Sequence, residues 1–230
     1  MSKKEIALSW SRLSNYRQCP RQFEAKYLTK EYPDEGENPA FAKGTKVHKQ
    51  LEDYILYKKG LNDEPVLGMI SSNVVPIIDK LFNQFGPDAI FAEQQLALDH
   101  KWRETTWFGK PDVVKFRGII DMIVFENAET ITVIDFKTGK FRPYDEDYGQ
   151  LHMTAAFLFE LYPDVQVVKS AYLFAEHKKK IVVTFKREDH AKTKAKFDVE
   201  YIQVNEDAEF VATKNSYCFF CLIKEDCKYG

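Results

Sequence analysis

The chain lacks any long hydrophobic run. None of its apolar stretches approaches the roughly 20 residues that a helix needs to cross a membrane, and no apolar signal region follows its Met-Ser-Lys-Lys-Glu start. We therefore expect no membrane partner and a cytoplasmic location.

The sequence also lacks an excess of positive charge. It has 33 Lys and Arg against 35 Asp and Glu, a net charge of −2, so contact with nucleic acid must come from local basic patches. Two runs of basic residues exist, although a solvated lysine-rich face is the more common explanation for such runs. The runs consist of Lys178, Lys179, Lys180, Lys186 and Arg187, followed by Lys192, Lys194 and Lys196.

Cysteine is scarce, with four residues in 230, so we expect metal ligation or simple burial rather than disulfides. Three of the four lie close together in the C-terminal tail as Cys218-Phe-Phe-Cys221 and Cys227, and Cys19 lies about 200 residues upstream. A Cys-x-x-Cys pair directs two thiolates at one ion or cluster. The spacing allows either a Cys₄ zinc site or a [4Fe–4S] cluster.

Hydrophobic residues make up 44% of the chain, enough for one sizeable core. We expect a single domain over 1–230, with a helical part at 1–88, a central part at 89–187 and a C-terminal helix and tail at 188–230. Periodicity predicts helices and strands in an order typical of an α/β fold with a mixed central sheet. The predicted helices span 9–32, 41–59, 65–85 (kinked at Pro76), 145–161 (opened by the acidic residues 145–147) and 188–203; the predicted strands span 90–98, 115–125, 131–137, 167–174 and 181–185.

The second and third predicted strands form a hairpin that concentrates charge. If Phe125 pairs with Ile131 across the loop, alternation places Asp121 opposite Asp135. Opposed like charges on an apolar face are destabilising unless a cation compensates them, and oxygen ligands suit Mg²⁺ or Mn²⁺. Lys137, on the same face, adds a positive charge that could act on a scissile phosphate. The alternative is a structural salt bridge between Lys137 and one aspartate.

These residues carry a family resemblance. Gly118-Ile-Ile-Asp121 followed by Asp135-Phe-Lys137-Thr-Gly139 resembles the core of the PD-(D/E)xK nuclease superfamily, in its RecB/AddB branch. Four more segments resemble motifs of that branch, in the same order along nearly the whole chain. They are the N-terminal signature at 11–23, the Gly-Thr-x-x-His segment at 44–48, the acidic position Glu93 and the Gln motif at Gln150-Leu151.

The resemblance implies a restriction-endonuclease-like core and a site built from matching positions. His48, Asp121, Asp135 and the main-chain carbonyl of Phe136 would ligate the metal. Lys137 would be the catalytic lysine, and Gln150 would hold the substrate or the edge of the site. Glu93 has either a role in the site or a surface salt bridge.

The same resemblance extends to the cysteines and to function. AddB-like nucleases and the CRISPR-adaptation exonucleases akin to them imply a [4Fe–4S] cluster on Cys19, Cys218, Cys221 and Cys227, closing the C-terminal tail onto the N-terminal part; zinc is the alternative. We expect an Mg²⁺- or Mn²⁺-dependent exonuclease acting on single-stranded or frayed DNA ends in recombination or repair. DNA is the expected partner, with a homo-oligomer or a recombination-protein partner left open. The alternative is a non-catalytic DNA-binding or assembly subunit that retains the cluster.

Overall fold

The computed structural model describes residues 5–31, 39–110, 113–141 and 148–229. Its centre is a five-stranded sheet in the order β1-β2-β3-β4-β5. The strands span Ile90–Asp99 (β1), Val114–Asn127 (β2), Thr130–Lys137 (β3), Val167–Phe174 (β4) and Lys179–Lys186 (β5). Only β3 and β4 pair in parallel; the other neighbours are antiparallel. The expected mixed sheet and α/β class are confirmed.

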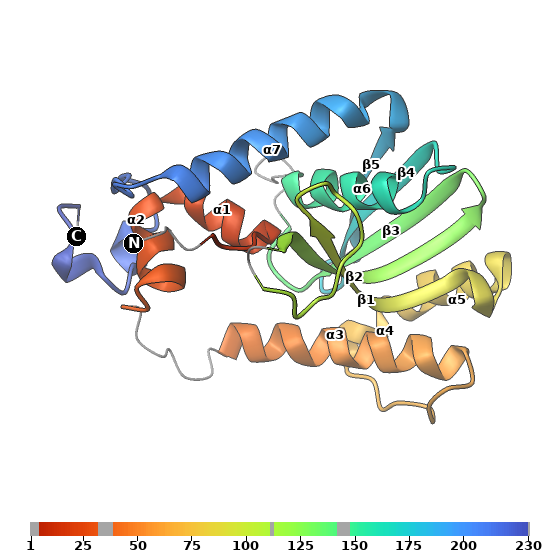
Figure 1. The fold of residues 1–230 in the computed structure, drawn as a ribbon. Coiled ribbons are helices and arrows are strands. Elements are labelled where there is room, and N and C mark those ends of the chain that lie inside the picture. Colours follow the sequence, from red (N-terminus) through yellow and green to blue (C-terminus); the bar gives the residue numbers. More distant parts are fainter. Residues whose placement is uncertain (1–4, 32–38, 111–112, 142–147, 230) are drawn as a thin grey trace.

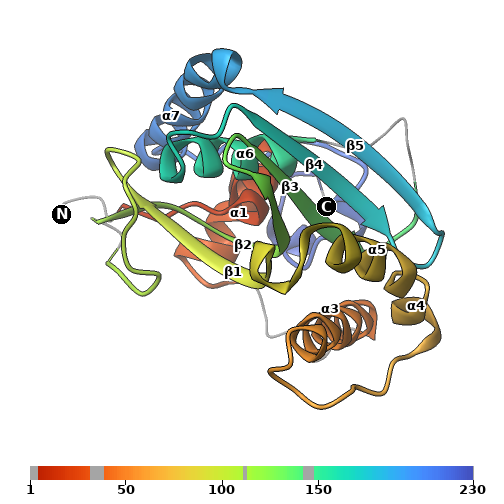
Figure 2. The same cartoon turned by 90° about the vertical axis from the view of Figure 1, so that its right-hand side faces the viewer.

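Helices cover both faces of this sheet (Figures 1 and 2). One face carries α3 (Pro39–Lys58), α4 (Met69–Ser72) and α5 (Val75–Phe85), and the other carries α6 (Gly149–Leu161) and α7 (His190–Glu206). Successive residues of each strand point to opposite faces of the sheet. Met122 and Ile134 therefore pack with the helices of the first face, and Ile123 and Val133 pack with those of the second. No helix in the described part of the chain is long and apolar enough to cross a membrane.

The N-terminal segment differs from the single helix expected over 9–32. It contains α1 (Trp10–Gln18), α2 (Pro20–Phe23) and a π-helical turn at Glu24–Leu28. Cys19 is extended, with φ −162° and ψ 109°, because the residue before a proline is disfavoured in the helical region. Pro20 then starts α2. The break leaves Cys19 in the corner between two helices.

The other boundaries lie close to expectation, with two exceptions. Residues 65–85 form two helices rather than one kinked helix, because Pro76 lies in the first turn of α5, where its missing N–H costs no hydrogen bond. The acidic residues 145–147, expected to open α6, lie outside the described residues. Short helical turns complete the chain at Pro87–Ala89, Arg187–Asp189, Cys218–Phe220 and Lys224–Asp226.

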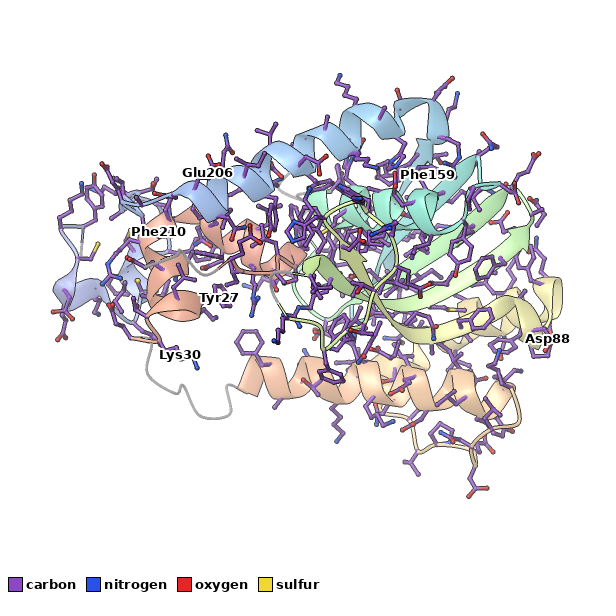
Figure 3. The ribbon with its side chains drawn as sticks, viewed as in Figure 1. Tyr27, Lys30, Asp88, Phe159, Glu206 and Phe210 are labelled. Carbon is purple, nitrogen blue, oxygen red and sulfur yellow. The ribbon has the colours of Figure 1, made fainter. Side chains whose placement is uncertain are left out.

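Helices α1 and α2 and the segment that follows α7 lie side by side at one end of the molecule (Figure 1). Tyr16 on α1 donates a 2.7 Å hydrogen bond to Asp207, and Phe210 packs on Phe23 with ring centroids 6.2 Å apart. Tyr27 and Phe210, labelled in Figure 3, lie in this region. The segment after α7 thus runs along α1 and α2 towards Cys19.

Candidate functional site

Three carboxylates occupy the same level of three neighbouring strands. The β2–β3 pairing includes Ile123↔Val133 and ends at Met122↔Ile134, which confirms the predicted register and makes Asp121 and Asp135 the next opposed pair. On the other side of β2 the pairs Ala92↔Met122 and Gln94↔Ile120 place Glu93 opposite Asp121. Like charges so arranged repel one another.

Glu93 interrupts its own strand. Its φ is 47°, a left-handed conformation that is unfavourable for a residue with a side chain. Such strain persists only where the surrounding structure imposes it, and it concentrates at functional sites. The bend brings the Glu93 carboxylate to the same point as Asp121 and a histidine from the neighbouring helix.

That histidine is His48 on α3. Its Nδ1 lies 3.3 Å from Oδ1 of Asp121, and one ligand atom each from His48, Glu93 and Asp121 lie within 4.8 Å of one another. Helix α3 passes close to the end of β3: a Cβ added at Gly44 would contact the Thr138 hydroxyl at 3.4 Å. His48, one helical turn further on, therefore reaches over the end of the strands.

Asp135 lies beside this group and is held by two other residues. Its Oδ2 lies 2.7 Å from Nζ of Lys137, and its Oδ1 accepts a 2.5 Å hydrogen bond from Nε2 of Gln150. Lys137 in turn donates to Oε1 of Gln150 at 2.8 Å, and its ammonium lies 4.5 Å from the centre of the Tyr172 ring. Asp135, Lys137 and Gln150 thus form a closed triangle whose members fix one another.

The position of Gln150 depends on the N-terminal segment. A Cβ at Gly149 would overlap the indole of Trp10, so glycine is required for α1 to pack against the start of α6. Gln150 follows directly in the first turn of that helix. The sequence predicted Gln150 as a holder of substrate or of the site edge; it did not predict a bridge between Asp135 and Lys137.

The acidic groups disturb one another's protonation. Burial, with the neighbouring Asp121 charge, raises the pKa of Glu93 to about 7. The bond to Asp121 raises the pKa of His48 to about 9, against the opposing effect of burial. Burial also raises the pKa of Asp135, although the Lys137 charge opposes this effect. The raised pKa values of Glu93 and Asp135 beside a third carboxylate indicate a place where a cation relieves repulsion.

The residue types and spacing fit a small divalent cation. Ligands about 2.0–2.2 Å from an ion are separated by up to roughly 4 Å, close to the spread of the His48, Glu93 and Asp121 atoms. The side of this group towards α3 opens into a groove lined by Phe41, Thr45, Glu52 and Thr138 among others. Of the four expected ligands, His48 and Asp121 belong to the group, and Asp135 adjoins it and carries the contacts above. The expected role of the Phe136 carbonyl stays a prediction.

The four cysteines line one cavity. Cys19, Cys218, Cys221 and Cys227 border it together with Arg21 and Lys224. Main-chain N–H groups approach two of the sulfurs: Thr213 donates to Cys19 at 3.5 Å, and Asn215 donates to Cys218 at 3.4 Å. Among the described residues, no three cysteine sulfurs lie within 4.8 Å of one another. The sequence alone gave no sign of the two N–H donors.

Comparisons with known proteins agree with this architecture. The family model of the PD-(D/E)XK nuclease superfamily matches residues 7–228. A proposed exonuclease from Eubacterium rectale is similar in structure, at a TM-score of 0.51 and 10% identity, over 94% of this chain and 86% of that one. The crystal structure of SSO0001 gives a TM-score of 0.48 at 16% identity, over 99% and 88% of the two chains. No curated protein matches the sequence. The fold is that expected of a restriction-endonuclease-like nuclease core.

Proposed function

Because the chain belongs to the PD-(D/E)XK nuclease superfamily, we propose that it is a metal-dependent DNA exonuclease whose site is formed by His48, Glu93, Asp121, Asp135 and Lys137. The observation that carries this proposal is the row of three carboxylates on β1, β2 and β3, with an imidazole on one side and an ammonium on the other. The E. rectale protein of similar fold, itself described as a proposed exonuclease, supports the choice of activity.

His48, Glu93 and Asp121 would hold the ion, with Asp135 as a further candidate ligand. Mg²⁺ or Mn²⁺ bound there would neutralise charge on the phosphate and make water a stronger nucleophile. Its binding would displace the proton of His48, whose raised pKa otherwise favours the charged ring.

Lys137 would contribute a fixed positive charge to the phosphate in the transition state. Its ammonium is positioned by Asp135, Gln150 and the face of Tyr172, and such preorganised charge stabilises charge that develops during the reaction. Gln150 touches both the acid and the ammonium, so its role is to position them.

We further propose that the chain belongs to the RecB/AddB branch and that its four cysteines bind a [4Fe–4S] cluster. Thiolates that share one zinc ion lie about 3.8 Å apart, given a Zn–S distance of about 2.3 Å. In an iron–sulfur cubane each thiolate binds a different iron, so the sulfurs are farther apart. The shared cavity and the N–H donors to two sulfurs support a centre common to the four cysteines. The absence of three described cysteine sulfurs within 4.8 Å of one another is compatible with the larger cluster. Its role would be structural, joining Cys19 to the tail.

The decisive experiment for the nuclease compares end-labelled linear single-stranded DNA with circular single-stranded DNA in the presence of Mn²⁺. We expect release of mononucleotides or short products from the linear substrate, with the circle left intact. Cleavage of the circle, which has no ends, would show that the protein is an endonuclease rather than an exonuclease. Binding of linear DNA without hydrolysis would favour the non-catalytic alternative. Asp121→Asn should abolish hydrolysis, and Glu176→Gln, at an exposed ion pair with Lys43, should not.

A further inference from the structure

A second cavity, separate from the acidic site and from the cysteines, lies between α6, β5 and α7. Its volume is about 590 Å³, within the range of small-molecule sites. It begins at Gly149, next to Gln150 of the acidic site, and continues along another face of α6 through His152 and Ala156 to Phe159. Phe159 is labelled in Figure 3. The proposed nuclease chemistry uses none of the side chains that line this cavity.

The inner wall of the cavity is apolar and its mouth is basic. Ala155, Ala156, Phe159 and Phe197 lie behind this wall and are each at least 97% buried, so the apolar surface open to a ligand includes the partly exposed Val183 and Phe185. Three exposed lysines at the mouth are Lys186, Lys192 and Lys196, against one lining acid, Asp189. The lining is therefore complementary to a ligand that combines a flat apolar part with negative charge.

The basic residues of this region divide into two groups. Arg187 serves the fold, because it donates hydrogen bonds to the carbonyls of Phe159, Tyr162 and Val165. Lys194 is held by Glu160 at 3.0 Å. Lys192 and Lys196, by contrast, form no ion pair with a described residue. Part of the lysine run is thus structural, and part faces solvent at the mouth of a cavity.

A buried histidine completes the lining. The His190 side chain is only 10% exposed, and its Nε2 lies 2.6 Å from Oε1 of Glu160. Nε2 faces the carboxylate, so Nδ1 is the ring nitrogen that remains for another partner. Nδ1 is buried and has no partner among the described residues. Buried polar atoms of this kind are rare in native proteins unless water or a ligand satisfies them.

We propose that this cavity binds a nucleoside 5′-monophosphate unit, with its base or sugar against the apolar wall and its phosphate at Lys192 and Lys196. Because His190 Nδ1 is enclosed in this structure, a sugar hydroxyl would hydrogen-bond with it only after a local shift of the lining side chains. A lone phosphate would leave the apolar wall unused, and a purely apolar ligand would leave the histidine and the lysines unused. The source of the unit rests on the proposed function: it is a nucleotide of the DNA strand being cut, or a mononucleotide released from it.

The test is isothermal titration of the protein with 2′-deoxyadenosine 5′-monophosphate in EDTA. Lys192→Glu/Lys196→Glu should weaken binding at least about tenfold, because it reverses both charges at the mouth. The matched control is Lys179→Glu/Lys180→Glu, which makes the same charge change at two exposed positions of β5 that do not line the cavity. Binding to the control should stay within about twofold of wild type.

Two outcomes would overturn the proposal: no binding by the wild type, or equal weakening in both double variants. Thr193→Trp, which puts a large ring at a lining position of α7, gives a second check, because it should block the ligand without changing charge. Retained helical circular dichroism would exclude misfolding in each variant. The titration measures binding and needs no catalysis. A protein without nuclease activity can therefore still bind the mononucleotide, and an active nuclease can lack this binding, so the two proposals are tested separately.

A competition arm identifies the source of the nucleotide. A 5′-phosphorylated single-stranded oligonucleotide of about 12 residues is added to the protein with the mononucleotide bound. Displacement of the mononucleotide from the wild type, together with weaker binding of the oligonucleotide by Lys192→Glu/Lys196→Glu, assigns the cavity to the DNA strand. Retention of the mononucleotide assigns it to the free product.

Discussion

The carboxylate of Asp121 accepts a 2.6 Å hydrogen bond from the main-chain N–H of Phe136. This bond lies just beyond the last pair of the β2–β3 ladder, Met122↔Ile134. A side-chain hydrogen bond therefore links the two strands at the point where their main-chain pairing ends. The other oxygen of the same carboxylate faces His48. Asp121 therefore joins two strands and belongs to the candidate metal site at once.

The two roles of Asp121 can be separated by substitution. Asp121→Asn retains a side-chain oxygen that can accept from Phe136 N–H, whereas Asp121→Ala removes it and leaves a buried donor unpaired. Urea denaturation in EDTA should show the alanine variant about 1–3 kcal/mol less stable than the asparagine variant. Both variants should lack nuclease activity. Equal stability of the two would contradict the joining role.

Metal binding should stabilise the protein. A cation that relieves repulsion among Glu93, Asp121 and Asp135 binds only the folded chain, and at about 100 times its Kd this contributes about 2.7 kcal/mol. For a domain of this size the melting temperature should rise by roughly 5–10 °C with Mn²⁺ and return with EDTA. Glu93→Gln should reduce the rise and Asp121→Asn should remove it, while Glu176→Gln behaves as wild type. If Mn²⁺ raised the melting temperature of Asp121→Asn as much as that of the wild type, the ion would have to bind at another site.

Lys137 should matter for the chemical step more than for metal binding. Lys137→Met keeps much of the side-chain length and removes the charge, so kcat should fall by about 10²–10³. The Mn²⁺-dependent rise in melting temperature should remain, because the substituted residue is not among the proposed ligands. Gln150→Ala should give a smaller loss of kcat, since it frees Asp135 and Lys137 without removing either. An unchanged kcat in Lys137→Met would show that the contact between Lys137 and Asp135 is only a structural salt bridge.

The cysteines should bind iron. Protein purified without oxygen should be brown and absorb visible light, with iron and sulfide in equal amounts, whereas a zinc protein would be colourless. Cys227→Ser should lose most of the absorbance. It should also lose several kcal/mol of stability, by analogy with other links that close long loops. The control is Lys228→Ser, at the adjacent exposed position, which should keep both properties. Zinc in place of iron, or an unchanged Cys227→Ser protein, would contradict the cluster.

The elements of the sheet could be predicted from the sequence because strand alternation and hairpin pairing are local properties. Phe125 and Ile131 are separated by a short loop, and once they pair, the pleat places Asp121 opposite Asp135. The break before Pro20 was also a local signal, since the residue before a proline avoids the helical region. The prediction of one continuous first helix was wrong because the helical spacing of apolar residues was given more weight than that proline.

What the tertiary structure decided are the contacts between segments distant in the chain. No local pattern indicates the left-handed Glu93, the bridge of Gln150 between Asp135 and Lys137, or the cavity around His190. The family resemblance implied that His48 lies with Asp121 and that Cys19 lies with the tail cysteines, but it gave none of the distances between them. Local sequence fixes which dihedral angles and pairings are favourable, but these distances depend on how the apolar faces of whole helices pack on the two sides of the sheet.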